Sequence, residues 1–513
     1  MPPSQGRLAT RVAAGILVTR ILGFVRERMF AHYFGNSPTA DAFRAALRIP
    51  NVIRNLLGEG TLSASFIPVY AGMIARGEVE GAKRLAGAVV SFLALLAAVA
   101  AGLGIVLAPV ITDLVAPGFD GATRELTVTL VQILFPMSAV FILSAWCLGV
   151  LNTHRRFFLA YAAPSLWNIA WIATLLAAGG VMAGARLATA LAIGAVVGSL
   201  LQLGLQLPAT LRLVRGVSPS LDLDVPGVRP VMRAWTPMVI GAGITQISGV
   251  IDTQLGSLLG TGAVAVLGYA QLVALLPVSL FGVSVAAAAL PELSRDAATA
   301  DHDVLRRRLG DGARRIAYFV VPSALAYATL ATPIVGTLFQ TGQFGTTDTE
   351  VAAGVLAAYS IGLLGQAAIR LFASGFYALG DTRTPVRIAV LALALSASLA
   401  VLFMQFFGPA GIALGAATGA YVNVGLLLTR LTRRIGPITT PADRRALVTV
   451  LLGGVTGVAA AWGMSLALAD QPIGIVCLGG LGGFGLAYAL VTYGLGHPEA
   501  RRLAAVLRRD DTG

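Results

Sequence analysis

The chain has 513 residues, of which 56% are apolar and only 12% are charged. Soluble domains carry about twice that charged fraction, so the composition excludes a soluble globular protein and indicates a polytopic membrane protein. The net charge of +13 would suit a nucleic-acid binder, but the placement of the basic residues along the chain favours membrane topology, and no nucleic-acid partner is expected. Two cysteines in apolar runs and four histidines without metal-ligand spacing predict no disulfide, metal or cofactor.

Two apolar segments near the N-terminus carry six arginines, namely Arg20, Arg26, Arg28, Arg44, Arg48 and Arg54. A charge near the bilayer centre costs roughly 3 kcal/mol on insertion scales. Six such charges in two segments therefore predict a water-filled, positively charged cavity. A cavity of that kind indicates a transporter for a negatively charged substrate.

Further along the chain, charge-free runs long enough to span a membrane occupy 85–112, 126–153, 157–185, 187–211, 316–347, 446–469 and 471–497. The longer runs 253–291 and 388–429 must each hold more than one helix, with turns at 260–262 and 408–411. Additional spans are expected around Met238 and Gly354. The sequence therefore predicts an all-α polytopic membrane protein with about 14 transmembrane helices.

The connecting loops predict the orientation. With the N-terminus in the cytoplasm, the cytoplasmic loops and the two ends of the chain hold 28 of the 37 basic residues. The opposite loops hold only Arg124 and Arg186, and the remaining seven, Arg370 among them, lie in the membrane. The positive-inside rule therefore places both termini in the cytoplasm.

A weak internal repeat suggests two related halves. Residues 107–109, followed by Gly118-Phe119, resemble residues 331–333, followed by Gln343-Phe344, about 225 residues later. We therefore expect two six-helix pseudo-symmetric lobes, at 1–220 and 221–440, a C-terminal helix pair at 441–500 and a cytoplasmic tail at 501–513. Transporters with such repeats commonly bind substrate between the halves, near the midplane.

The arginines of the second charged segment share a helix face. Asp41, Arg44 and Arg48 are spaced i, i+3, i+7. Pro50 removes a backbone hydrogen bond, so we expect a kink or break between Arg48 and Arg54.

Three carboxylates, Glu27, Asp41 and Glu59, are available to pair with the six arginines, which leaves the region positive. Arginine suits phosphate recognition because its planar guanidinium gives bidentate hydrogen bonds and keeps its proton. Arg28, near a helix end, has the alternative of reaching the membrane interface. Asp252, the one acidic residue between 234 and 291, is either a cation or proton site or the partner of an arginine.

Several motifs then carry a resemblance to a known family. They are Thr19–Glu27 (TRILGFVRE), 40–43 (ADAF), 49–54 (IPNVIR), 58–63 (GEGTLS), 66–68 (FIP), Tyr269-Ala270, Pro277, 333–335 with 342–344 (PIV and GQF), and 376–385 (FYALGDTRTP). Together they resemble the MurJ (MviN) lipid II flippases of the MOP exporter superfamily. The resemblance covers nearly the whole chain.

The resemblance implies fourteen helices, with the final pair forming a groove for the undecaprenyl tail, and alternating access that moves lipid-linked peptidoglycan precursor across the bacterial cytoplasmic membrane. Family cavity arginines correspond to Arg20, Arg26 and Arg54, Arg48 matches a commonly basic position, and Asp41 and Glu59 match motif acids. We expect Asp41, Glu59 and Glu27 to act in gating or ion pairing. Lipid II, membrane lipids and cell-wall synthesis proteins are the implied partners.

One position departs from the family pattern. An arginine usually stands two residues after the Tyr-Ala pair, where this chain has Leu272 after Gln271. Arg44, at a position that is often apolar in the family, precedes Pro50 at nearly the interval by which Leu272 precedes Pro277. We hypothesise that Arg44 replaces the lost charge.

Several alternatives remain open at this stage. They are a flippase for another polyprenyl-linked glycan, an inactive homologue acting as a scaffold, and a polytopic glycosyltransferase, for which only Asp222-Leu223-Asp224 offers carboxylates. A multidrug cation exporter would need an acidic cavity. The energy source is either the membrane potential or a monovalent cation, because the chain has no nucleotide-binding P-loop.

Overall fold

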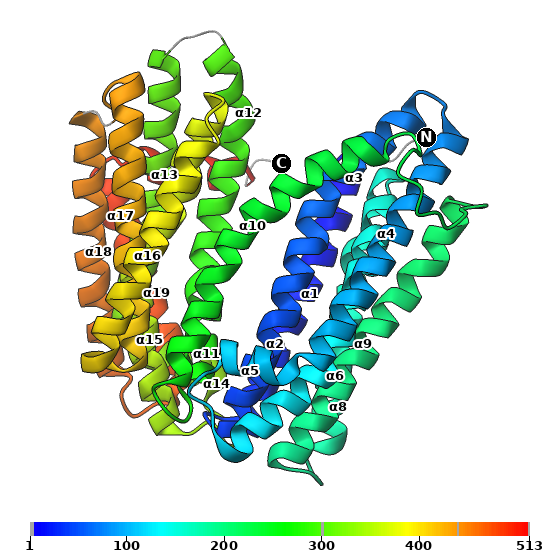
Figure 1. Ribbon diagram of the computed structural model, residues 1–513. Helices are drawn as coiled ribbons and strands as arrows, with labels where there is room; N and C mark the ends of the chain where they lie inside the picture. The colour runs from blue at the N-terminus through cyan, green and yellow to red at the C-terminus, as the bar shows by residue number, and fades with distance from the viewer. Residues whose placement is uncertain (1–4, 299–301, 439–440, 511–513) are drawn as a thin grey trace. The chain divides into compact units, whose positions relative to one another are not determined.

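The computed structural model describes residues 5–298, 302–438 and 441–510. Within these ranges it describes only the backbone at 5–16, 59, 63, 240–241, 244–245, 298, 441 and 506–510. All regular structure in that part of the chain is helical, apart from one isolated bridge between Thr341 and Phe344 (Figure 1). The predicted all-α class is confirmed.

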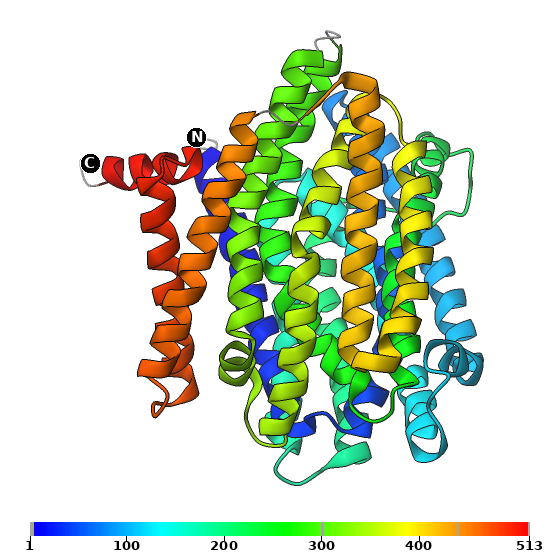
Figure 2. The same cartoon turned by 90° about the vertical axis from the view of Figure 1, so that its left-hand side faces the viewer.

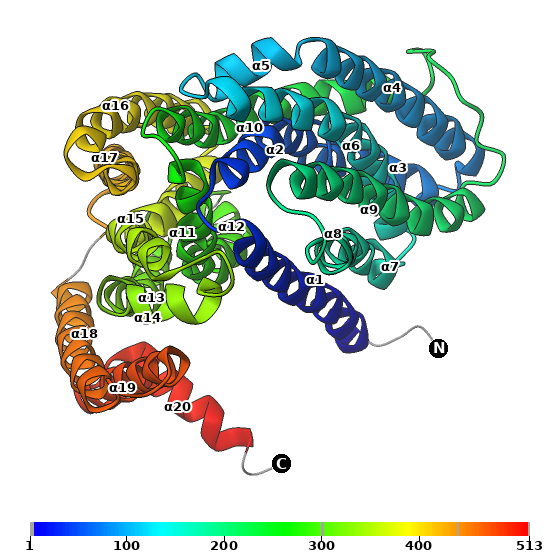
Figure 3. The same cartoon turned by 90° about the horizontal axis from the view of Figure 1, so that it is seen from below.

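The chain forms two compact units, and the first contains Met1–Ala265 together with Thr341–Phe344. Its helices are α1 (Gln5–Phe34), α2 (Pro38–Leu57), α3 (Glu59–Ala75), α4 (Val79–Val106), α5 (Ala108–Val115), α6 (Gly121–Thr153), α7 (Phe157–Ala162), α8 (Pro164–Ala178), α9 (Gly184–Leu213) and α10 (Val228–Ser257). Helix α6 is central and packs against α2, α3, α4 and α9, while α8 lies between α1 and α9 (Figure 3).

The second unit contains Val266–Gln340 and Gly345–Gly513. Its helices are α11 (Ala263–Pro277, which begins in the first unit), the π-helix η1 (Val278–Val283), α12 (Ser284–Ala298), α13 (His302–Thr329), α14 (Ala331–Phe339), α15 (Thr346–Ala378), α16 (Arg383–Phe407), α17 (Pro409–Ile435), α18 (Pro441–Ala467), α19 (Ile473–Gly494) and α20 (Pro498–Asp510). Helix α15 packs against α12, α13, α14 and α17, and α18 pairs with α19. The short α20, red in Figure 2, turns off the end of α19.

The boundary of the first unit lies at Ala265, whereas the sequence predicts an N-terminal lobe that ends at 220. Helix α10 accounts for the difference because it packs on α2, α3 and α5. The segment Thr341–Phe344 joins the first unit through a hydrogen bond from the Gln343 amide to the His32 carbonyl, 2.8 Å long.

Ten helical segments in the described part of the chain are long and apolar enough to cross a membrane, or eleven if α13 and α14, bent by 81°, form one span. Helix α2 is outside this group because Asp41, Arg44, Arg48 and Arg54 all lie within its twenty residues. A multi-span membrane protein is confirmed, while the number of about 14 spans stays a prediction.

The same order of elements occurs in both units. A long helix, α4 or α13, is followed after one residue by a short one, α5 or α14. Each pair is then followed by a helix of 33 residues, α6 or α15. This recurrence matches the sequence repeat, whose members lie at the starts of α5 and α14.

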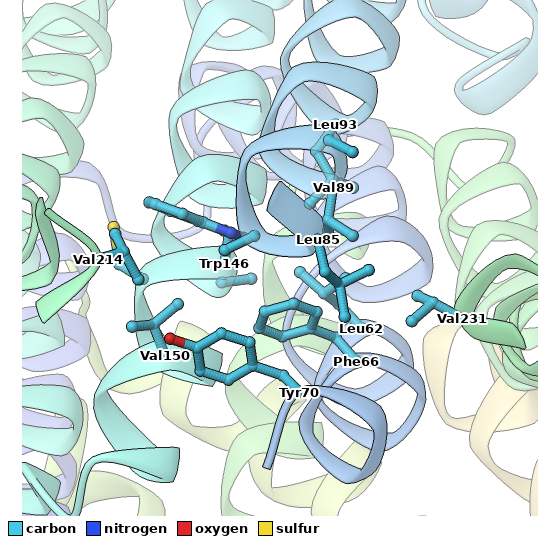
Figure 4. Close-up of a cluster of buried hydrophobic side chains, with 14 of the residues drawn as sticks. Leu62, Phe66, Tyr70, Leu85, Val89, Leu93, Trp146, Val150, Val214 and Val231 are labelled. Carbon is cyan, nitrogen blue, oxygen red and sulfur yellow. The ribbon is translucent and has the colours of Figure 1, made fainter. Parts of the chain in front are cut away.

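A cluster of buried apolar side chains holds α3, α4 and α6 together, with Phe66, Tyr70 and Trp146 as its largest members (Figure 4). The rings of Phe66 and Tyr70 stack with their centroids 5.0 Å apart. Because lipid tails are as apolar as leucine, such a cluster stabilises a membrane protein chiefly through van der Waals packing. This packing fixes the position of α6, which also packs against the arginine-bearing helix α2.

Candidate anion-binding cavity

Helix α2, which carries four of the charged residues, begins with a strong start signal. The Ser37 side chain accepts a hydrogen bond from the Ala40 amide at 3.2 Å, and Pro38 occupies the first turn. The helix runs through Pro50 to Leu57 without interruption, so of the kink or break that Pro50 predicted, the break is absent. Arg48 and Arg54 therefore lie on one helix.

A cavity of about 460 Å³ lies among α1, α2, α8, α9 and α10 of the first unit. Its wall consists of Thr19, Gly23, Arg26, Arg48, Asn51, Val52, Arg54, Asn55, Pro164, Trp167, Asn168, Gln202 and Gln246. Among these thirteen residues are three arginines and five carboxamides, and no carboxylate. The cavity is therefore cationic and rich in neutral hydrogen-bonding groups.

Arg26 is held in place from three sides. Its Nη1 donates to Oδ1 of Asn168 at 3.0 Å, and its Nη2 donates to Oε1 of Glu27 at 2.6 Å. Its guanidinium also lies over the rings of Trp167 and Trp171, 4.7 and 5.0 Å from their centroids. Each cation–π contact contributes about 0.5–2 kcal/mol, so Arg26 is oriented before any anion binds.

The other two lining arginines are also positioned by neighbours. Arg54 lies over the ring of Phe141 on α6, 4.4 Å from its centroid. Arg48 donates from Nε to the Gly249 carbonyl oxygen on α10 at 2.6 Å and also from Nη2 to the same oxygen. Both guanidinium groups lie in the cavity wall, where an anion can reach them.

Glu27 on α1 is the carboxylate that links Arg26, in the cavity wall, to Arg44 on α2. It is buried and accepts from Arg26 through one oxygen and from Arg44 through the other, at 2.6 and 2.9 Å. Arg44 also lies over the ring of Phe30 and is absent from the cavity wall. Arg44 therefore acts on the cavity through Glu27.

Asp41 has a different environment from the one that an arginine-pairing role implies. Its carboxylate is 1% exposed and accepts hydrogen bonds from the amides of Gly262 and Ala265, the latter at 2.8 Å. Gly262 immediately precedes α11 and Ala265 lies in its first turn, so Asp41 on α2 supplies a carboxylate cap to that helix.

The remaining predicted residues lie outside the cavity wall. Arg20 and Arg28 are exposed on α1, and Asp252 is half-buried on α10, within electrostatic range of Arg48. Leu272 lies on α11 in the second unit, and the side chain of Glu59 falls outside the described residues. The structure thus brings together Arg26, Arg48 and Arg54 from the predicted set.

Sequence reasoning missed the groups that orient the arginines: Phe141, Trp167, Asn168 and Trp171. A usable signal was present, because Asn168 and Gln202 are carboxamides within otherwise apolar spans. Such polar side chains usually face a protein interior or a cavity. Asn168 is 4% exposed and Gln202 is 2% exposed.

A polytopic helical bundle with an arginine-lined cavity is the arrangement of a membrane transporter for an anionic substrate. The family model described as lipid II flippase MurJ matches residues 30–474. The lipid II flippase MurJ of Burkholderia cenocepacia is 36% identical over 437 residues, which cover 83% of this chain and 84% of that protein. The probable lipid II flippase MurJ of Haemophilus influenzae is 32% identical, covering 87% and 90%.

Solved structures show the same fold. A lipid II flippase MurJ in an inward closed conformation superposes with a TM-score of 0.78 at 24% identity, covering 94% of this chain and 99% of that one. An inward-facing multidrug resistance MATE family transporter of the MOP superfamily gives a TM-score of 0.67 at 16% identity, covering 84% and 98%. The chain belongs to the MurJ lipid II flippase family, whose members are transporters and not enzymes.

Proposed function

We propose that this protein is a lipid II flippase, which moves undecaprenyl-pyrophosphate-linked peptidoglycan precursor from the cytoplasmic to the outer leaflet of the bacterial cytoplasmic membrane. The observation that carries the proposal is the cavity whose wall holds Arg26, Arg48 and Arg54 and, among the side chains that the structure describes, no carboxylate. The family match and the curated relatives give the same function for proteins of this sequence type.

The two kinds of polar group in the cavity suit the two parts of this substrate. Guanidinium groups form charge-assisted, bidentate hydrogen bonds with phosphate oxygens. Carboxamides such as Asn51, Asn55 and Gln246 both donate and accept, which suits sugar hydroxyls and peptide amides. The pyrophosphate therefore binds at the arginines and the neutral glycan beside the amides.

Glu27 is the group through which substrate binding would influence the transport cycle. An anion that binds Arg26 competes with Glu27 for the same guanidinium, so it stabilises whichever state loosens that ion pair. Asp41 and Glu59 remain proposed gating residues. The energy source is either the membrane potential or a monovalent cation at Asp252.

Both termini are proposed to lie in the cytoplasm, following the positive-inside rule. Membrane lipids surround the protein, and cell-wall synthesis proteins are the proposed protein partners. The second candidate function is transport of another polyprenyl-linked glycan. It shares the pyrophosphate, so the arginines alone do not discriminate between the two substrates.

The test is rescue of bacterial cells depleted of their own lipid II flippase. We compare the native chain with Arg54→Ala, and with Arg124→Ala as a control that removes the same charge from an exposed ion pair with Asp113. Immunoblotting of membranes confirms equal expression. Rescue by the native chain and by Arg124→Ala but not by Arg54→Ala supports the proposal, whereas failure of the well-expressed native chain contradicts it and favours another lipid-linked glycan.

A further inference from the structure

A second basic cavity lies in the first unit, where α6 ends, α7 begins and α9 ends. Its volume is about 440 Å³. It is lined by Arg155, Arg156, Phe157, Phe158, Leu159, Ala209, Arg212 and Leu213. None of these residues lines the cavity that holds Arg26, Arg48 and Arg54 (called the central cavity from here on), so the two are separate sites.

The charge of this cavity is not compensated by the described carboxylates. Arg155, Arg156 and Arg212 are exposed, and none of them forms an ion pair with an acidic side chain that the structure describes. Burial, together with the nearby charge of Arg156, holds the pKa of the adjacent His154 below its ordinary value. The three arginines are therefore the source of the positive potential.

The backbone at Arg155 indicates that its side chain has a use. Its φ is +59°, and every other described residue with positive φ is a glycine. The amides of Arg155 and Arg156 donate to the carbonyls of Asn152 and Leu151, at 3.0 and 2.8 Å, in the turn that ends α6. Glycine is the usual residue at such a position, because any other side chain crowds the backbone there. An arginine kept despite that crowding points to a function for the guanidinium.

Apolar surface adjoins the three charges. Phe158 is 58% exposed, and Leu211, next to Arg212, is 42% exposed. Both α6 and α9 are membrane-span candidates that end here, at Thr153 and Leu213. The cavity therefore lies where these two candidate spans end, and its wall carries both cations and an exposed phenylalanine.

We propose that this cavity binds the phosphate headgroup of an anionic phospholipid of the cytoplasmic leaflet, with the acyl chains lying against Phe158. Basic pockets between helices on the cytoplasmic side of membrane proteins bind such headgroups. A water-soluble anion would gain nothing from the exposed phenylalanine. Three arginines supply enough donors for a lipid with two phosphates, because one guanidinium can form bidentate hydrogen bonds with a phosphate. The proposal uses the predicted orientation of the chain but does not depend on the transported substrate.

Cardiolipin is the probe for the test, and binding to the purified full-length protein is measured by native mass spectrometry. The test variant is Arg155→Gly with Arg156→Gln and Arg212→Gln. The control, Arg76→Gln with Arg124→Gln and Arg229→Gln, removes the same charge from arginines that pair with carboxylates elsewhere. The test variant is expected to bind its tightest cardiolipin on the order of 100-fold more weakly, and the control is expected to bind as the native protein does.

Arg155→Gly alone separates binding from folding. It keeps the turn and relieves the backbone, so its thermal unfolding midpoint in lipid-free detergent should equal or exceed that of the native protein while its cardiolipin affinity falls. Equal affinity in the native protein and the triple variant, or an equal loss in the control, overturns the proposal. Displacement of the cardiolipin by undecaprenyl pyrophosphate at equal concentration would also overturn it, because the site would then belong to the transported lipid.

Discussion

Arg26 on α1 and Asn168 on α8 are 142 residues apart in the sequence and joined by a hydrogen bond of 3.0 Å. Both residues line the central cavity. The bond directs one Nη of the guanidinium along a fixed axis, and the indole rings of Trp167 and Trp171 hold its plane. A side chain with many rotamers thus becomes a preorganised anion receptor, which saves ordering entropy when substrate binds.

Two substitutions of Asn168 separate its hydrogen bond from the charge of the cavity. Asn168→Ala removes one acceptor from Arg26 and should weaken binding of lipid II roughly tenfold, since hydrogen bonds to charged groups contribute about 1.5–3 kcal/mol. Asn168→Asp places a carboxylate against the guanidinium and should weaken binding further. The measurement is lipid II affinity by native mass spectrometry, and an affinity of Asn168→Asp equal to the native value would contradict the role of Arg26.

Glu27 is expected to be a stability determinant as well as a competitor for anions. Glu27→Ala removes the buried carboxylate that the half-buried Arg26 and Arg44 share, and removing one partner of a buried pair costs up to about 3–5 kcal/mol. The thermal unfolding midpoint in detergent should fall accordingly. Adding Arg44→Ala to Glu27→Ala should recover part of the loss, and a double variant that loses the full sum of the single effects would show that Arg44 and Glu27 are not coupled.

The hypothesis that Arg44 replaces the charge missing at Leu272 has a direct test. Arg44→Ala should impair rescue of flippase-depleted cells because Glu27 and Arg26 lose their support. If Arg44 acts only through Glu27, adding Leu272→Arg to Arg44→Ala should not restore growth, and this is the result that we expect. Restoration of growth would favour the replacement hypothesis.

Asp41 should matter to stability more than to substrate binding. Asp41→Ala leaves the buried amides of Gly262 and Ala265 without an acceptor, and each orphaned buried group costs about 1–3 kcal/mol. Asp41→Asn keeps one acceptor and should lose less. Thermal unfolding and lipid II affinity are measured on both variants. A normal unfolding midpoint with abolished binding would instead place Asp41 in the substrate site.

His497 lies in the turn between α19 and α20, and its environment predicts that the stability of the folded protein depends on pH. Burial, followed by the charge of Arg314, lowers its pKa from 6.5 to about 4. The unfolded chain therefore takes up a proton near pH 6.5 that the folded protein refuses until about pH 4, so stability should fall as the pH drops through that window. The unfolding midpoint is measured across it, with His497→Gln as the control whose profile should be flatter.

The sequence by itself determined the fold class and the chemistry of the central cavity. Apolar runs of spanning length need no tertiary information to indicate helices, because the backbone of a spanning segment must satisfy its own hydrogen bonds in lipid. The arginines between Arg20 and Arg54 likewise predicted an anion site, because the cost of an intramembrane charge is a local property. The motifs around Arg26 and Arg54 predicted the family, and the comparisons confirmed it.

Only the tertiary structure decided which charges act together. Spacing along α2 put Asp41, Arg44 and Arg48 on one face, yet Asp41 caps α11, Arg44 binds Glu27 and only Arg48 reaches the cavity wall. These outcomes depend on partners from α1, α10 and α11 that are distant in sequence. Coulomb energies and hydrogen bonds vary over a few ångströms in space, and distance along the chain does not encode that separation.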